Sequence, residues 1–199
     1  MTSSTSRRAT VSRNTKETAI DVDLDLDGSG VVAVATGLPF FDHMVAQLGK
    51  HGGFDLTLKA EGDLDVDAHH TVEDVGIALG QVVAQALGDK AGIRRFASMS
   101  LPLDEALVEV ALDLSGRSFL HYEVEPGREP LGTPPFDPQL AEEFWRAFAT
   151  SAAITLHLRL RSGKNPHHIL EASFKGVARC LRDAVRIEGG GVPSTKGTL

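Results

Sequence analysis

The chain has a single cysteine and no long hydrophobic run. Because one cysteine cannot pair within the chain, an internal disulfide framework is excluded. Cys180 stands in the apolar-periodic stretch VARCLRDAV, which is typical of a packed core thiol. No stretch approaches the roughly 18 apolar residues of a membrane helix, and the N-terminal MTSSTSRRATVSRNTKE lacks the apolar region of a signal peptide. We therefore expect a cytoplasmic protein without a membrane partner.

The sequence also lacks an excess of positive charge. Its net charge of -7 argues against a general nucleic-acid binder, because such domains usually present a basic face. Its 199 residues are enough to bury a substantial core, either as one domain or as two small fused units. We expect one compact body that does not bind nucleic acid.

The chain aligns with itself. TKETAIDVDLDLDG, from Thr15, matches LDEALVEVALDLSG, from Leu103, at an offset of 88, and both alternate with the period of a strand. VVAVATG and SFLHYEV are then expected to be hairpin partners of these strands. FFDHMVAQL matches AEEFWRAFA as a helix, and FDLTLKA matches ITLHLRL as a strand, at an offset of 100. DAHHTVEDVGIALGQVVAQAL matches NPHHILEASFKGVARCLRDAV as a second helix at an offset of 98.

Each half is therefore predicted to run strand, strand, helix, strand, helix. We expect an α+β fold made of this internally duplicated unit, with pseudo-twofold symmetry and sheets packed against helices. The repeats are predicted to span about residues 9–92 and 93–199 of a single domain, 1–199. Asp67 and Asn165 are the expected N-caps of the second helices, with Pro166 in the first turn.

Each repeat carries the motif HHxxE at the start of its second helix. The glutamate lies one helical turn beyond both histidines, so its carboxylate can lie between them. Adjacent histidines project about 100° apart, so one ion cannot easily bind both. Two ions, with each histidine pair divided between them, are the simplest consequence. Imidazole and carboxylate without thiolate suit manganese, iron, nickel or zinc, and six nitrogen and oxygen donors favour manganese. The motif residues are His69, His70, Glu73, His167, His168 and Glu171.

The repeat predicts one further metal ligand in each half. His43 in FFDHM aligns with Glu143, so the two units differ by a histidine-to-glutamate exchange at one position. Either residue type can bind manganese. The alternative for Glu143 is a surface glutamate beside Glu142, with equal weight. His51, before a Gly-Gly turn, is left open.

The C-terminal tail GGGVPSTKGTL combines backbone amides, two hydroxyls and a lysine, which together can wrap a phosphate group. A disordered tail is the alternative. Arg95 and Arg117 follow glycine-containing turns and offer forked donors to phosphate oxygens, although surface arginine is the alternative for each. The tail residues concerned are Ser194, Thr195 and Lys196.

Two glutamates occupy matching places near strand ends. Glu17 stands between apolar-alternating residues, and Glu105 is its counterpart in the second repeat. A carboxylate beside a metal-bound substrate can transfer a proton. The alternative is an exposed strand residue, which for Glu105 has at least equal weight.

The motifs FFDHM, DAHHTVED, LPLDEAL, LSGR, GKNPHHILEASFKGVAR and PSTKG together resemble the imidazoleglycerol-phosphate dehydratase family. The resemblance runs from about Ala9 to the C-terminus. It implies a duplicated α+β fold like domain 2 of ribosomal protein S5. It also implies a homo-oligomeric shell of 24 subunits, with two Mn(II) ions per active site at subunit contacts.

The resemblance assigns roles to matching positions. Glu143 departs from the family pattern, since some relatives have a histidine ligand there. The arginines, Ser194 and Lys196 would bind phosphate. Metal ligands would be His43, His69, His70, Glu73, His167, His168 and Glu171. Substrate contacts would include Glu17, residues 43–51 with His43 and His51, Arg95, Arg117, Lys175, Ser194, Thr195 and Lys196.

The implied reaction converts D-erythro-imidazoleglycerol phosphate to imidazole acetol phosphate in histidine biosynthesis. If the ring binds as an imidazolate between two Mn(II) ions, its electrons can expel the neighbouring hydroxyl and form a diazafulvene. A base then removes a proton to give an enol, which ketonises. Glu17 is the expected base, with His70 or Glu171 as rivals. The competing predictions are a noncatalytic metal-binding shell protein and a dinuclear metallohydrolase.

Overall fold

Six elements follow one another in the same order in each half of the chain, as described for residues 7–199 by a computed structural model. The predictions for the N-terminal segment and for a domain from residue 1 include residues 1–6, which lie outside the described residues. The first half contains β1 (Arg8–Asn14), β2 (Thr18–Asp25), β3 (Val32–Ala35), α1 (Pro39–Gly52), β4 (Asp55–Gly62) and α2 (His69–Leu87). The second contains β5 (Phe96–Leu103), β6 (Ala106–Asp113), β7 (Phe119–Glu123), α3 (Leu140–Ser151), β8 (Thr155–Ser162) and α4 (Pro166–Ala184).

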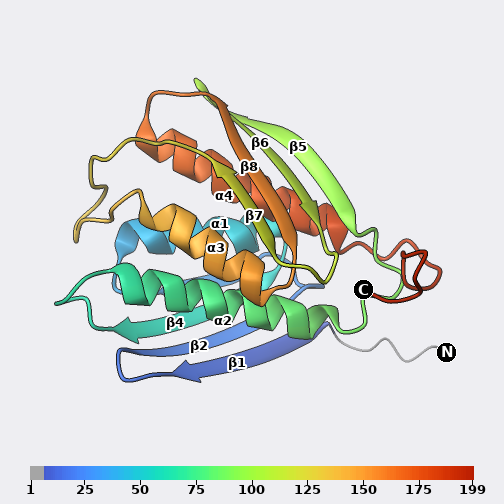
Figure 1. Cartoon of the computed structure of the whole chain (residues 1–199). Helices are drawn as coiled ribbons and strands as arrows, with labels where there is room; N and C mark the ends of the chain where they lie inside the picture. Colours follow the sequence, from blue (N-terminus) through green and yellow to red (C-terminus); the bar gives the residue numbers. More distant parts are fainter. Residues whose placement is uncertain (1–6) are drawn as a thin grey trace.

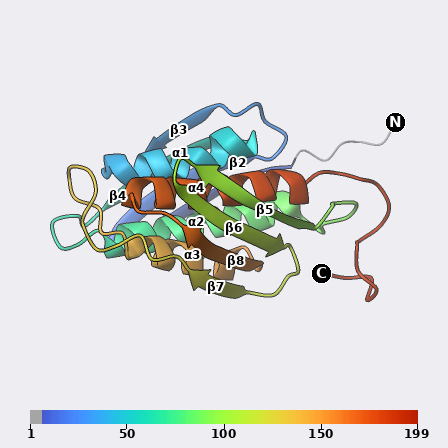
Figure 2. The same ribbon diagram turned by 90° about the horizontal axis from the view of Figure 1, so that it is seen from above.

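Two four-stranded sheets enclose the four helices (Figure 1). The strand order is β1-β2-β4-β3 in the first sheet and β5-β6-β8-β7 in the second. Helix α2 packs on the first sheet and α4 on the second, while α1 contacts α4 and α2 contacts α3. Seen from above, the second sheet lies over the helices (Figure 2). The α+β fold with a repeated unit is therefore confirmed.

The strand register repeats between the two sheets. Val22 pairs with Leu58 in the first sheet, and Val110 pairs with Leu158 in the second. These partners differ by offsets of 88 and 100, the same offsets that align the two halves of the sequence. The internal alignment therefore places equivalent residues at equivalent positions of the fold.

The predicted strand pairing is wrong in one respect. Strands β3 and β7 were expected to form hairpins with β2 and β6, but they pair in parallel with β4 and β8 instead. Each repeat also has one more strand than predicted, because β1 and β5 form antiparallel edge pairs with β2 and β6. The intervening helix explains the parallel pairing, since it carries the chain from the end of the edge strand back to the end of the sheet where that strand began. The next strand, β4 or β8, then runs parallel to the edge strand and lies inside it.

Aromatic side chains fill the space between the helices. Phe144 and Trp145 of α3 are fully buried, and the Phe144 ring stacks on Phe174 of α4 at 5.2 Å between centroids. Gly76 of α2 lets α3 approach closely, because a Cβ there would lie 2.7 Å from the carbonyl oxygen of Phe144. Cys180 is buried, which confirms the core-thiol prediction.

All four helices begin at the same end of the molecule, on the left of Figures 1 and 2. Asn165 caps α4 by accepting a hydrogen bond from the His167 amide, and Pro166 starts the helix, as predicted. The N-cap predicted at Asp67 is wrong by one residue, because Ala68 is the N-cap of α2. Asp67 nevertheless accepts a hydrogen bond from the His69 amide at 3.2 Å. Within residues 7–199, no helix is both long and apolar enough to span a bilayer.

Candidate active site

A histidine–carboxylate cluster joins α1 to the first turns of α4. The Glu171 carboxylate lies 3.0 Å from His167 Nε2 and 3.6 Å from His43 Nε2. One ligand atom from each residue lies within 4.8 Å of the others, and among residues 7–199 this is the one such group of three. The exposed fraction of the Glu171 side chain is only 13%. Imidazole nitrogens with a carboxylate are a donor set that fits Mn(II).

Lys175 stands one turn further along α4. Its Nζ lies 2.8 Å from Glu171 Oε1. Burial alone would raise the pKa of Glu171, but Lys175, His43 and His167 outweigh burial and lower this pKa. Glu171 is therefore held as a carboxylate, the form that ligates a metal. His51, predicted to bind substrate, lies at the end of α1, where burial and then the charges of Lys175 and Arg179 lower its pKa.

The second histidine of each motif forms a hydrogen bond with a carboxylate outside the cluster of His43, His167 and Glu171. His168 Nδ1 lies 2.8 Å from Glu105 Oε2, and His70 Nδ1 lies 3.0 Å from Asp63 Oδ2. These hydrogen bonds are the largest cause of the raised pKa of each histidine. The two rings of each motif are 6.2 Å apart and nearly perpendicular in both repeats. The paired histidines therefore diverge, as the 100° argument requires.

Glu105 is held as a carboxylate. Its hydrogen bond to His168, followed by those from the Asn165 and Lys164 amides, lowers the pKa of Glu105 to about 2. Glu17, its counterpart in the first repeat, lies in the β1–β2 turn with Oε2 3.9 Å from His70 Nδ1. Glu17 thus stands beside an HHxxE motif, and just over half of its side chain is exposed.

The other predicted ligands are not gathered into a cluster within the described chain. His69 and Glu73 are half-buried in the first turns of α2. Glu143 lies 3.6 Å from Arg146 and lines a separate hollow with Tyr122 and Glu142. The sequence repeat places Glu143 opposite His43, but no group of three donors forms around it among residues 7–199.

The predicted phosphate-binding residues come together in one polar pocket of about 820 Å³. Arg95 forms a bidentate pair with Asp113, at 2.7 and 3.1 Å, and also donates to the Pro193 carbonyl at 2.7 Å. Arg117 is largely exposed there and lies 4.0 Å from Asp113. The Lys196 amide donates to Ser194 Oγ, which tightens the tail. Lining residues include Arg95, Arg117, Ser194, Thr195 and Lys196.

The first turns of α2 and α4, which carry the histidine motifs, and the C-terminal tail, which lines the polar pocket, lie at opposite ends of the fold (Figure 1). The Arg95 amide donates to the carbonyl of Ala184, the last residue of α4, whereas His167 and His168 lie in the first turn. At about 1.5 Å per residue, the 19 residues of α4 separate these ends by roughly 28 Å. One small substrate cannot reach both ends of the same chain.

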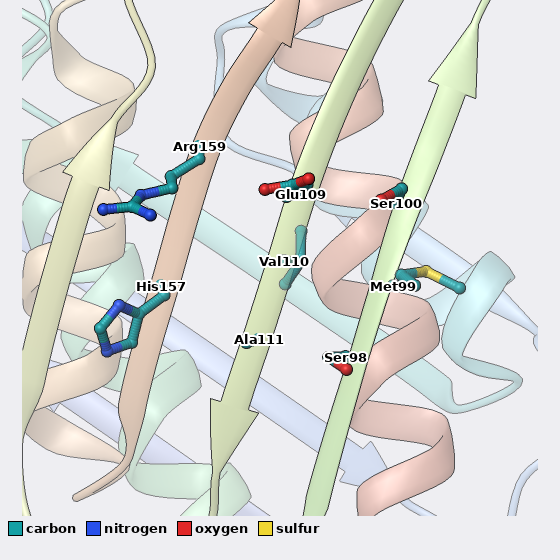
Figure 3. A pocket seen from close by; sticks show the side chains of 8 residues that line it. All are labelled: Ser98, Met99, Ser100, Glu109, Val110, Ala111, His157 and Arg159. Carbon is teal, nitrogen blue, oxygen red and sulfur yellow. The ribbon is translucent and has the colours of Figure 1, made fainter.

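Another hollow, of about 600 Å³, lies on the outer face of the second sheet (Figure 3). Glu109 and Arg159 flank it on neighbouring strands, beside His157 of β8. The His157 ring stacks on His121 with centroids 5.2 Å apart. His157 therefore lies on the outer face of β8, and no HHxxE residue lines this hollow.

The sequence did not predict that three carboxylates of these sites hold a histidine or an arginine in place. Asp63, Glu105 and Asp113 hold His70, His168 and Arg95, respectively. Asp63 lies only seven residues before His70, so the acidic run DLDVD before the motif was a usable signal. The Glu105 and Asp113 contacts depend on strand pairing and were not readable from spacing.

The fold and these groups define a class of protein: a duplicated α+β structure with two histidine–histidine–glutamate units. Residues 36–181 match the family model described as imidazoleglycerol-phosphate dehydratase. Proteins of that name from Acidothermus cellulolyticus and Parafrankia are 57% and 56% identical to the chain, over 97% of its length and 93% and 99% of theirs.

Solved structures agree with the sequence relatives. The imidazoleglycerol-phosphate dehydratase of Pyrococcus furiosus is 34% identical, with a TM-score of 0.81 over 95% of this chain and 100% of that one. The Staphylococcus aureus enzyme, also 34% identical, has a TM-score of 0.79 over 90% and 99%. The chain belongs to the imidazoleglycerol-phosphate dehydratase family and is an enzyme of the hydro-lyase class.

Proposed function

We propose that the protein dehydrates D-erythro-imidazoleglycerol phosphate to imidazole acetol phosphate, a step of histidine biosynthesis. The observation that carries the proposal is the convergence of His43, His167 and Glu171 on one point, because an imidazole-bearing substrate needs a metal-type donor set to activate its ring. Family membership supports the same reaction. A cytoplasmic location stays a prediction from the sequence.

The proposed cofactor is Mn(II), with two ions per active site. His43, His167 and Glu171 would hold one ion, and their nitrogen and oxygen donors fit it. His69, His70, Glu73 and His168 are the further proposed ligands, and Glu143 is proposed as an additional one. When bound, Mn(II) would supply Lewis acidity that stabilises negative charge on the substrate ring.

Glu17 is the proposed base. Just over half of its side chain is exposed, and within residues 7–199 its carboxylate lies beside His70 without a hydrogen bond that would occupy it. The rival bases are already engaged, because His70 binds Asp63 and Glu171 binds both Lys175 and His167. In the proposed ring-assisted elimination, the hydroxyl group next to the ring leaves with the electrons of its C–O bond, and the proton that Glu17 takes from the adjacent carbon completes the released water molecule. Glu17 removes the proton from the adjacent carbon, and the resulting enol ketonises.

The polar tail pocket is the proposed phosphate site. Arg117 and Lys196 bring positive charge to it, while the Ser194 and Thr195 hydroxyls offer further donors. Arg95 is saturated by Asp113 and Pro193, so it orders the tail and adds charge to the pocket. Lys175 and His51 would instead contact substrate near the histidine cluster.

The separation of about 28 Å between the two ends supports an active site completed by different subunits. A homo-oligomer of 24 subunits is the proposed assembly. In it, the histidine end of one subunit would meet the phosphate pocket of another. Neither a nucleic acid nor a membrane is a proposed partner.

The proposal is tested by removing Mn(II) with a chelator, restoring it, and assaying imidazole acetol phosphate formation. Activity should disappear and return with the metal. Lys196→Ala should raise KM while leaving metal content and assembly unchanged, because the lysine contacts phosphate alone. Phosphate release instead of the ketone would indicate a hydrolase, and absence of product with Mn(II) bound would refute the proposed function.

A further inference from the structure

We propose that Glu105 and Asp63 are positioning residues, which fix the ring orientation and tautomer of His168 and His70 so that each Nε2 is available to a metal. The inference rests on the proposed Mn(II) site. Metal-binding histidines commonly donate their second ring N–H to a carboxylate, which sets the tautomer. Both histidines have this arrangement, with carboxylate oxygens 2.8 and 3.0 Å from Nδ1.

The Glu105 carboxylate is itself fixed in direction. Its Oε1 accepts hydrogen bonds from the Lys164 and Asn165 amides, at 3.2 and 2.8 Å. Oε2 is thereby presented to His168 Nδ1, which must carry the proton. The lone pair of the neutral ring then lies on Nε2, where the nearest carboxylate oxygen, on Asp104, is 3.9 Å away and beyond hydrogen-bond distance.

The two repeats achieve this with different residues. In the second repeat the positioning carboxylate is Glu105, the counterpart of Glu17, whereas in the first it is Asp63. The position that corresponds to Asp63, at the end of the matching strand, is Gly163, which has no side chain to offer. Because Asp63 holds the His70 ring, Glu17 is not needed for that role. The duplication has separated proton transfer, assigned to Glu17, from ligand positioning, assigned to Glu105.

The substitution Glu105→Gln distinguishes a positioning role from a purely structural role. In Glu105→Gln, the amide oxygen is expected at the Oε1 place, because two backbone N–H groups point there. The amide NH₂ then faces His168 Nδ1 and favours the tautomer with the proton on Nε2, which cannot ligate a metal. The loop around Lys164 keeps its hydrogen bonds, so stability is retained while metal binding is lost.

The test is calorimetric titration of the metal-free assembled protein with MnCl₂. Glu105→Gln should weaken Mn(II) binding about 10- to 100-fold, the usual effect of removing such a partner. Its thermal unfolding midpoint without metal should match that of the unsubstituted protein. Glu123→Gln is the matched control, because Glu123 also pairs with a histidine, His121 at 2.9 Å, but on the outer sheet edge. That control should bind Mn(II) normally.

Substitutions of Asp63 test the proposal independently of Glu105. No backbone amide fixes its carboxylate among the contacts of the described residues, so Asp63→Asn can turn its oxygen to His70 and should lose less affinity than Glu105→Gln. Asp63→Ala should lose more than Asp63→Asn. Unchanged Mn(II) affinity in both Glu105→Gln and Asp63→Ala would overturn the proposal. If Glu105→Gln fails to assemble, unchanged affinity in Asp63→Ala alone does so.

Failure of the proposed function gives a different result. The unsubstituted protein would then bind Mn(II) without forming the ketone. The affinity measurements use the metal alone, so they test the positioning residues whichever reaction the site performs.

Discussion

A mixed oligomer of two impaired variants, Glu17→Gln and Lys196→Ala, should be more active at low substrate concentration than either variant alone. Glu17 lies beside the first turn of α2, and Lys196 lies in the pocket beyond the last turn of α4. The substrate spans less than about 10 Å from ring to phosphate, by ordinary bond lengths. That length is well short of the roughly 28 Å along α4, so in the proposed active site the two residues would come from different subunits.

The size of the recovery follows from random assembly. In a one-to-one mixture, a site has an intact Glu17 half of the time and, independently, an intact Lys196 half of the time. About a quarter of the sites are then complete, in a symmetric oligomer whose sites are alike. Activity at low substrate concentration should therefore approach about 25% of the unsubstituted value.

The assay uses co-expression of the two variants with different affinity tags, tandem purification of mixed oligomers, and measurement of imidazole acetol phosphate. Each variant purified alone, and the two blended without subunit exchange, are the controls. If the mixed oligomer is no more active than the blend, both residues act from one subunit or do not act in one site. Both explanations contradict an active site that takes Glu17 from one subunit and Lys196 from another.

Two further predictions concern the core. Gly76→Ala should lower the free energy of unfolding by about 1–3 kcal/mol in urea titrations, because its Cβ would lie 2.7 Å from the Phe144 carbonyl oxygen. Gly191→Ala, with nothing within 4 Å of the added Cβ, is the control and should change stability little; equal effects would contradict the packing argument. Burial raises the pKa of Cys180 to about 12, so iodoacetamide at pH 8 should modify it only after denaturation, and rapid labelling of the native protein would be inconsistent with this.

Much of the fold was predictable because it is repeated. The offsets of 88 and 100 reappear in the strand register, where Val22 and Leu58 pair as Val110 and Leu158 do. Strand partners were not predictable in the same way. Alternation tells which face of a strand is buried, but it does not tell which neighbour the strand binds, and so β3 and β7 were assigned to the wrong strands.

The candidate site was predictable where motif spacing decides geometry. The divergence of adjacent histidines follows from the helical period, and the ring separations agree with it. Contacts between distant segments were not predictable, because they depend on packing. The Glu105–His168 hydrogen bond joins residues 63 positions apart. The separation of the tail pocket from the histidine motifs is likewise a property of the folded chain alone.

Arg95 connects three distant segments of the chain, since it directly precedes β5, pairs with Asp113 of β6 and donates to the Pro193 carbonyl in the tail. A guanidinium that is already ordered restrains the tail before any ligand arrives. The conformational entropy of the tail is therefore lost during folding rather than on binding, which favours tight association. In the proposed phosphate site, Asp113 would thus promote phosphate binding by preorganising the tail, although its own charge repels a phosphate group.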